Sequence, residues 1–192
     1  MSFNKKRFSI KDLTAHKIEC KKAAQNWLDS DCLILDTETT GLDDNAEIIE
    51  ISIIDKDFNV LFNTLVKPSC EISKEATAIN NITNKDVEYE QAFDEIYSKL
   101  KDVLENRLVV MYNSNFDTRI LNQTIELYDL QKIPFERKCA MLLFSRFIDV
   151  KRWQKLSTAT EHFNIKFTNQ HQALSDCEAT LKLIKSIADY TD

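Results

Sequence analysis

The sequence predicts a mixed α/β fold in which antiparallel strands come first and alternating strands and helices follow. Three observations indicate this class. The apolar run at 32–35 leads directly into acidic residues, as expected at the end of a buried strand. Segments 47–54 and 60–66 are rich in β-branched residues and are joined by a polar turn. After residue 90, stretches with helical periodicity alternate with a second apolar run.

The N-terminal 30 residues are predicted to form an extension before a domain that spans residues 31–192. Residues 1–12 are polar and basic, and we expect a loosely ordered lead-in there. Within 13–28 the apolar residues recur at helical spacing, which predicts an amphipathic helix. The polar residues 29–31 end this helix before the first strand begins.

The first three strands are predicted to form an antiparallel meander. The strand that opens at 32 is followed by strand-like segments 47–54 and 60–66, with residues 55–59 as the turn between the last two. Pro68 ends the meander.

The second half of the sequence is predicted to be mostly helical, with one further buried strand at 108–112. The helix before this strand suggests a crossover connection. A short helix and loop are expected at 73–90, and a loop around Pro134. The remaining predicted helices span 91–105, 115–128, 139–148, 156–163 and 173–190.

The composition limits the functional classes. The 192 residues carry a formal net charge of −6, which argues against binding nucleic acid mainly through bulk positive charge. It does not exclude a nucleic-acid enzyme whose bound cations reverse the local field. No apolar run approaches the roughly 20 residues of a membrane span, and no signal peptide is evident. The five cysteines have no CxxC spacing, so we expect a reducing, cytoplasmic location.

The acidic pair Asp36 and Glu38 is the first candidate site. Side chains two positions apart on a strand point to the same face, so the two carboxylates converge. Buried acids that repel each other need a compensating cation, which predicts a metal site. Gly41 is the only glycine in the chain, and it suits a sharp turn or a close approach to a ligand. Other acid pairs with this spacing lie in helix ends and turns, where we expect solvated side chains.

Two more acids and one histidine have informative surroundings. Asp117 begins a helix just after the second buried strand, and Asp176 lies early in the final helix. Considered separately, Asp117 could simply complement a helix dipole and Asp176 could be an exposed acid. His171 by itself could equally be a surface or core residue.

Together, these stretches resemble the DEDD exonuclease superfamily. The three motifs are DTETTGL at 36–42, YNSNFD at 112–117 and HQALSD at 171–176. The histidine five residues before the last aspartate is similar to the DEDDh, DnaQ-like branch, which includes the epsilon subunit of DNA polymerase III and ribonuclease T. The tyrosine of the DEDDy branch would fall at Gln172. The resemblance covers roughly residues 30–188.

The resemblance implies a ribonuclease-H-like mixed β-sheet flanked by helices, and an exonuclease domain at 31–192. It also implies metal-dependent 3′→5′ hydrolysis of single-stranded nucleic acid, with DNA slightly favoured, to nucleoside 5′-monophosphates. Two Mg²⁺ or Mn²⁺ ions are expected. The implied metal ligands are Asp36, Glu38, Asp117 and Asp176, and His171 is the implied general base. The implied substrate-binding residues are Thr39, Thr40, Gly41, Leu42, Asn113 and Phe116.

Three alternatives remain open at this level. The domain could act as a proofreading or accessory subunit with a separate DNA polymerase or another replication or repair protein. It could process RNA, since no motif reports on the 2′-hydroxyl. It could also be a non-catalytic nucleic-acid-binding relative, which five intact site residues make least favoured.

Three details depart from the family pattern or lie outside it. Tyr112 stands where many members have histidine, and Asn80-Asn81 stand where many have His-Gly. Asn81 could keep the turn, because asparagine tolerates the left-handed backbone region. The segment 151–155 (KRWQK) could contact a nucleic acid backbone and stack on bases, or it could be a solvated charged turn.

Overall fold

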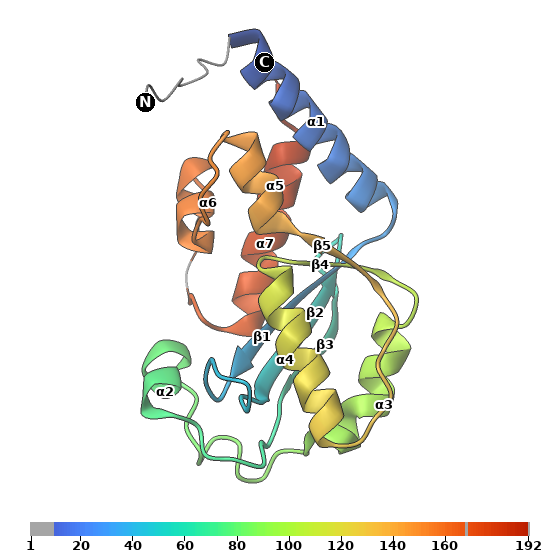
Figure 1. The fold of residues 1–192 in the computed structure, drawn as a ribbon, viewed down its shortest axis with the longest axis vertical. Coiled ribbons are helices and arrows are strands. Elements are labelled where there is room, and N and C mark those ends of the chain that lie inside the picture. The colour runs from blue at the N-terminus through green and yellow to red at the C-terminus, as the bar shows by residue number, and fades with distance from the viewer. Residues whose placement is uncertain (1–9, 168, 192) are drawn as a thin grey trace, which may run out of the picture.

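A computed structural model describes residues 10–167 and 169–191, and its centre is a five-stranded mixed sheet (Figure 1). The strands are β1 (Leu33–Thr39), β2 (Ile48–Asp55), β3 (Val60–Leu65), β4 (Leu108–Met111) and β5 (Glu136–Cys139), in the order β3-β2-β1-β4-β5. β1 to β3 form an antiparallel meander, whereas β4 pairs parallel to β1 and β5 pairs parallel to β4. The predicted fold class is confirmed.

β1 is the middle strand, and both of its faces are covered. Leu33 and Leu35 point into a core that α3 (Phe93–Leu104) and α4 (Ser114–Leu127) cover. Ile34 points into a second core beneath α1 (Ile10–Asp29), α5 (Ala140–Phe147) and α7 (Ala173–Ala188). This alternation follows from the period-2 geometry of a strand. Because both faces are buried, β1 is an almost continuous apolar run up to its acids.

Seven helices lie in the described part of the chain, and all were predicted to within a few residues. The predicted stretch at 73–90 contains one short helix, and the others lie where the periodicity placed them. They are α1 (Ile10–Asp29), α2 (Lys74–Asn80), α3 (Phe93–Leu104), α4 (Ser114–Leu127), α5 (Ala140–Phe147), α6 (Leu156–His162) and α7 (Ala173–Ala188).

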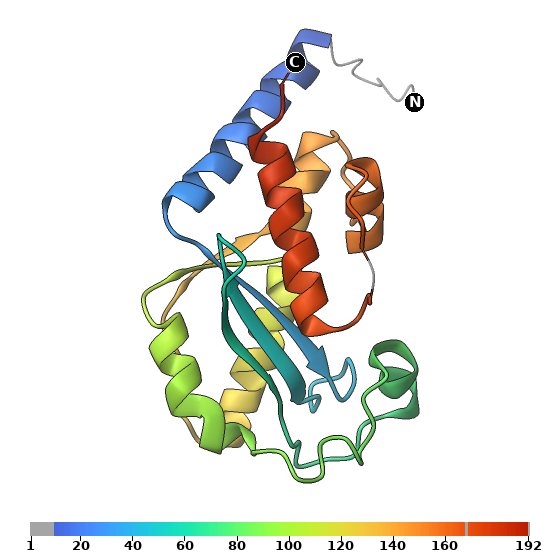
Figure 2. The ribbon, with the colours of Figure 1, turned by 180° about the vertical axis from the view of Figure 1, so that it is seen from behind.

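Helix α1 packs against α7 and α5, as Figures 1 and 2 show from opposite sides. Its residues Cys20 and Ala24 are buried in the same core as α7. Lys21 Nζ donates to the carbonyl of Tyr190 at 2.8 Å, and Gln25 Nε2 donates to that of Ala188 at 3.1 Å. The predicted amphipathic helix is therefore confirmed. Of the predicted lead-in at 1–12, residues 1–9 lie outside the described residues, and the prediction is wrong for residues 10–12, which belong to α1.

Strand β5 is the one element that the sequence did not predict. Its residues Glu136–Cys139 were placed in the loop around Pro134, and residue 139 at the start of the next helix. Three charged side chains precede Cys139, so no apolar pattern marks the strand. Such charge is typical of an edge strand, where it discourages pairing with another chain.

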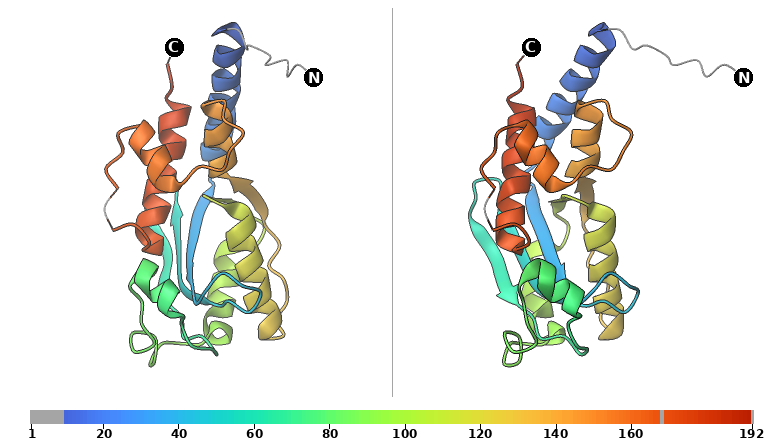
Figure 3. Two further views of the ribbon diagram at one scale, coloured as in Figure 1. Left: turned by 60° about the vertical axis from the view of Figure 1, so that its left-hand side comes forward. Right: turned by 90° about the vertical axis from the view of Figure 1, so that its left-hand side faces the viewer.

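The carboxyl ends of β1 and β4 lie at the same edge of the sheet, where α4 and α7 begin. Both views in Figure 3 show α2 close to the end of β1 and to the chain that leads into α7. No helix in the described ranges is both long and apolar enough to cross a membrane. The candidate residues from all three motifs therefore come from one end of the sheet.

Candidate active site

The first acidic pair lies where the sequence placed it, on one face at the end of β1. Asp36 pairs with Ser52 across the sheet, and Glu38 pairs with Glu50. Thr37, between them, points to the opposite face, and its Oγ1 donates a hydrogen bond of 3.0 Å to Asp117 Oδ1. This bond fixes the acid of the second motif to the strand that carries the first.

The third motif joins this group through the start of α7. The His171 N–H donates to Asp176 Oδ1 at 3.2 Å, and His171 adopts a left-handed φ of 62°. One ligand atom each from Glu38, His171 and Asp176 lies within 4.8 Å of the others. The structure therefore brings together side chains that are far apart in the sequence.

These carboxyl groups destabilise each other's charged forms. Burial, together with the nearby carboxylates of Asp176 and Glu50, raises the pKa of Glu38 to about 8. Burial likewise raises the pKa of Asp117 to about 7 and that of Asp176 to about 7. The pKa of Asp36 also lies well above its usual range, because of burial and the neighbouring carboxylates.

The donor set fits divalent cations with a preference for oxygen ligands. Within the described part of the chain, no lysine or arginine is among the main causes that set the pKa values of these four acids. A group of acids without a positive partner is costly unless cations neutralise it. Carboxylate oxygens without thiolate ligands suit Mg²⁺ or Mn²⁺ better than Zn²⁺.

Two residues outside the predicted site help to hold it. Glu50 Oε2 accepts a hydrogen bond of 3.1 Å from the Ala173 N–H at the start of α7, and burial raises the pKa of Glu50. The buried Asn80 amide hydrogen-bonds the Glu38 carboxyl group, which lowers the Glu38 pKa. Glu50 could have been found from the sequence only through the register of β1 on β2. Asn80 was visible as a departure from the family pattern.

The residues after Glu38 divide into buried and open positions. Thr39 Oγ1 donates to the Gly41 carbonyl at 2.7 Å. The buried Thr40 Oγ1 accepts from the Glu47 N–H at 3.0 Å, so this side chain has a partner within the protein. Leu42 is 74% exposed.

The backbone conformation at residue 41 does not require glycine. Its φ is not positive, and the nearest atom to an added Cβ would be Ser73 Oγ at 4.0 Å. A turn at Gly41 therefore does not use the left-handed region that glycine favours. The expectation that Gly41 allows a close approach by a ligand stays a prediction. Asn81, by contrast, does adopt the left-handed conformation (φ 62°) and ends α2, as expected.

The second motif forms the start of α4. The Asn113 carbonyl accepts a hydrogen bond from the Phe116 N–H at 2.9 Å. The partly buried Phe116 ring has the Arg119 guanidinium 5.5 Å from its centroid. Arg119 also donates to the Leu42 carbonyl at 3.0 Å. Asn113 and Phe116 therefore lie on the helix that contacts the loop after β1.

A hollow of about 290 Å³ opens beside the catalytic candidates. Its lining includes His171 and Asp176 from the third motif, Tyr112 from the second, and Trp153 and Lys155 from the segment before α6. A substrate bound in this hollow would touch both Asp176 and His171.

A family model described as exonuclease (RNase_T) matches residues 33–184. The chain belongs to the exonuclease family. The match covers the sheet and six of the described helices, and it includes all three motifs. The predicted resemblance is confirmed at the level of the family.

Curated relatives of this exonuclease family member include a phage protein and replicative polymerase components. The chain is 38% identical over 178 residues to an uncharacterized exonuclease, CP81, of Escherichia phage 186, covering 86% of this chain and 92% of that protein. It is 32% identical over 120 residues to the DNA polymerase III epsilon subunit of Buchnera aphidicola, covering 57% of this chain and half of that subunit. It is 31% identical to a PolC-type DNA polymerase III of Thermotoga petrophila, covering 79% of this chain but 11% of that polymerase.

Solved exonuclease structures share the fold. Exonuclease X, solved in complex with 5′-overhanging duplex DNA, is 26% identical with a TM-score of 0.64, over 83% of this chain and 94% of that one. The nuclease domain of 3′hExo, a DEDDh family member bound to rAMP, has a TM-score of 0.71 at 20% identity, over 83% and 92%. The second likeness supports the mixed sheet and helix arrangement described above.

Proposed function

We propose that the protein is a DEDDh 3′→5′ exonuclease that hydrolyses single-stranded nucleic acid, with DNA favoured, to nucleoside 5′-monophosphates. The observation that carries this proposal is the convergence of Glu38, Asp176 and His171 at one end of the sheet. Asp36 and Asp117 lie beside them, joined through Thr37. An acid cluster beside a histidine is the set of groups that metal-assisted phosphodiester hydrolysis needs.

Asp36, Glu38, Asp117 and Asp176 are the residues proposed to hold two Mg²⁺ or Mn²⁺ ions. When bound, such cations supply positive charge that stabilises the charge developing on the phosphate. The raised pKa values of these acids support the assignment, because burial and mutual repulsion disfavour the charged forms that a bound cation would stabilise.

His171 is the proposed general base, taking a proton from the attacking water. Histidine changes its protonation state near neutral pH, which suits this role. Its exposed position at the rim of the hollow leaves it accessible to water and substrate. The proposed substrate contacts are the Gly41 backbone and the exposed Leu42 side chain, with Thr39, Thr40, Asn113 and Phe116 positioning that surface.

The test is hydrolysis of 3′-labelled single-stranded DNA, single-stranded RNA and mismatched duplex, with Mg²⁺ and with Mn²⁺. Asp36→Ala and Asp176→Ala should abolish mononucleotide release. His171→Ala should lower kcat by about 10²- to 10⁴-fold while changing KM little. The exposed acid Glu88 provides a matched control, and Glu88→Ala should leave the rate unchanged. Undiminished activity in purified Asp36→Ala would exclude the proposal.

A second candidate function is proofreading with a separate DNA polymerase. The relatives named as polymerase III components favour this reading, although the chain spans only 11% of the PolC-type polymerase that it matches. Preference for the mismatched over the matched duplex would support it. Equal rates on both would favour a free-standing enzyme acting on single strands.

A further inference from the structure

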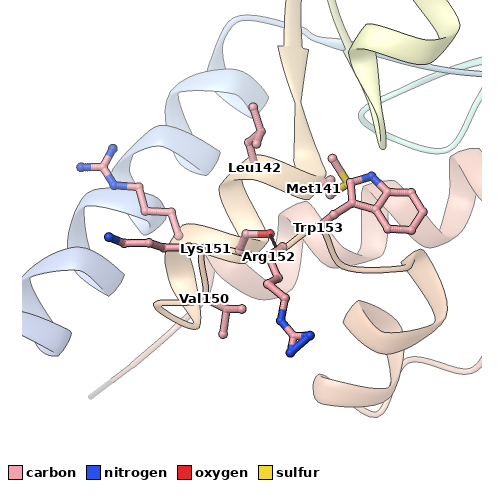
Figure 4. A pocket seen from close by; sticks show the side chains of 8 residues that line it. Met141, Leu142, Val150, Lys151, Arg152 and Trp153 are labelled. Carbon is pink, nitrogen blue, oxygen red and sulfur yellow. Dashed lines mark hydrogen bonds between the residues drawn. The ribbon is translucent and has the colours of Figure 1, made fainter. Parts of the chain in front are cut away.

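A second hollow lies next to the active-site hollow, on the face formed by α5 and the loop that follows it (Figure 4). It has a volume of about 300 Å³. Two of its lining side chains are large, apolar and unusually open: Leu142 is 61% exposed and Trp153 is 63% exposed. Figure 4 shows the Trp153 ring beside Met141, with Lys151 and Arg152 extending from the same loop.

Trp153 belongs to the lining of both hollows, so the two hollows are neighbours at this residue. One contains His171 and Asp176, and the other lies beside α5. A ligand chain that starts at the acids and continues outward would therefore cross the indole ring.

The loop that carries Trp153 is fixed by hydrogen bonds on both sides of this residue. The buried Tyr112 hydroxyl donates to the Gln154 carbonyl at 2.9 Å. Ser145 Oγ donates to the Arg152 carbonyl at 3.3 Å. Tyr112 is the departure from the family's histidine, and here it anchors the loop to the end of β4. The position of Trp153 relative to the acids is thus set by the fold.

The loop also supplies positive charge. Lys151 and Arg152 are exposed, and within the described ranges neither side chain has an ion pair. Arg146 adds a third cation at the hollow, where it pairs with the exposed Glu19 of α1. In a chain with a net charge of −6, these residues form a local cationic surface beside an acidic centre.

We propose that this surface binds the part of a single-stranded substrate that lies on the 5′ side of its terminal nucleotide. A base stacks on Trp153, and the backbone phosphates lie against Lys151 and Arg152. An aromatic face beside cations is how proteins hold single strands without reading their sequence. This inference rests on the proposed function, and it resolves the open interpretation of segment 151–155 in favour of contact with nucleic acid.

The kinetic test compares a 12-nucleotide strand with a dinucleotide. Trp153→Ala should raise KM for the 12-mer by about 5- to 100-fold, the range expected for a lost base stack, and leave its kcat unchanged. The KM increase should be smaller for the dinucleotide, because it offers only one base on the 5′ side of its terminal nucleotide. Trp153→Phe should restore most of the affinity. Tyr89, an exposed aromatic residue before α3, provides the control, and Tyr89→Ala should have no effect.

The charge contribution is tested by salt dependence. Each phosphate contact with a single strand contributes about 0.7 to the slope of log affinity against log salt. The double variant Lys151→Ala/Arg152→Ala should therefore lower this slope by about 1.4 for the 12-mer. An unchanged slope would show that Lys151 and Arg152 do not contact the substrate phosphates.

A binding measurement separates this inference from the proposed function. The chain has two tryptophans, so a Trp27→Phe variant leaves Trp153 as the only indole. Quenching of its emission by a 12-mer reports stacking whether or not hydrolysis occurs. Quenching without hydrolysis would support the proposed single-strand binding surface and contradict the exonuclease assignment. Hydrolysis without quenching would reject the surface alone, and so would an equal loss of dinucleotide and 12-mer hydrolysis in Trp153→Ala.

Discussion

At the scale of single residues, Glu38 shows how the site is built. Its carboxyl group lies among Asp176, Glu50 and Asp117, which all raise its pKa, and the Asn80 amide lowers that pKa. Asn80 also accepts a hydrogen bond from the Ile82 N–H at 2.9 Å, so its orientation is fixed. The Glu38 carboxylate is therefore held in place by a neutral donor, while the repulsion from the other acids stays uncompensated by the protein.

This repulsion predicts a pH dependence of stability in the metal-free protein. Unfolded Asp and Glu titrate near pH 4, whereas Glu38 titrates at about 8 and Asp117 and Asp176 at about 7 in the fold. The folded state therefore binds more protons between these values, and its stability falls as pH rises through this window. We expect the melting temperature in EDTA to be lower at pH 8 than at pH 5 by on the order of 5–10 °C.

Two additions make this measurement specific to the site. Mg²⁺ should recover the melting temperature at pH 8 and have little effect at pH 5, where protonated acids bind cations weakly. Asp117→Asn removes a carboxylate that raises the pKa values of Glu38 and Asp176, and it should flatten the profile in EDTA. A profile that does not change in this variant would place the pH dependence elsewhere in the protein.

At the scale of elements, the start of α7 depends on a contact from β2. The Ala173 N–H is one of the first amides of α7, which have no hydrogen-bond acceptor within the helix. Glu50 accepts its hydrogen bond. Because Asp176 lies one turn further along α7, this bond positions the acid of the third motif. Glu50 is thus a positioning residue on the strand next to the catalytic strand.

Glu50→Gln and Glu50→Ala should separate the hydrogen bond from the charge. The glutamine keeps an acceptor for the Ala173 N–H, so we expect kcat to stay close to that of the unchanged protein. The alanine removes the acceptor, and we expect kcat to fall about tenfold or more, with a loss of about 1 kcal/mol in stability. Steady-state kinetics and urea unfolding check both. Equal kcat values for the two variants would show that the bond does not position the site.

The elements also show where sequence reasoning succeeds and where it stops. β1, the meander and the helices were predictable because burial leaves apolar periodicity in the sequence, as in α3, where Phe93, Ile96 and Leu100 share one stripe. β5 was not predictable, because its exposed edge needs no apolar side chains. The five catalytic candidates were found from their motifs. Glu50 was not, since its role depends on which residue of β2 faces Glu38.

At the scale of the whole molecule, α1 is part of the core rather than a separate layer. Ala24 is fully buried among α7 residues such as Ile184 and Ala188. The same α7 carries Asp176 at its other end. Changes at the α1 interface therefore act on the helix that completes the site.

Ala24→Asp should lower the free energy of unfolding by about 3 kcal/mol or more, because it buries a charge without a partner. Lys22→Asp introduces the same side chain on the exposed face of α1 and should change stability by less than about 0.5 kcal/mol. Urea denaturation of both variants checks this. Similar midpoints would contradict the contribution of α1 to the stability of the core.

The position of β1 between two partners has a consequence for motion. Amide protons of a central strand exchange with solvent mainly when the whole fold opens, whereas those of exposed connecting segments exchange through small local openings. Leu33 and Ile34, which pair with both β2 and β4, thus belong to the slowest-exchanging part of the protein, and the exposed segment around His171, before α7, to a fast-exchanging part. Hydrogen exchange should separate the two by orders of magnitude in rate. His171, the proposed general base, can then move each time the nucleic-acid substrate advances by one nucleotide, while the strand that carries the carboxylates stays fixed for as long as the protein remains folded.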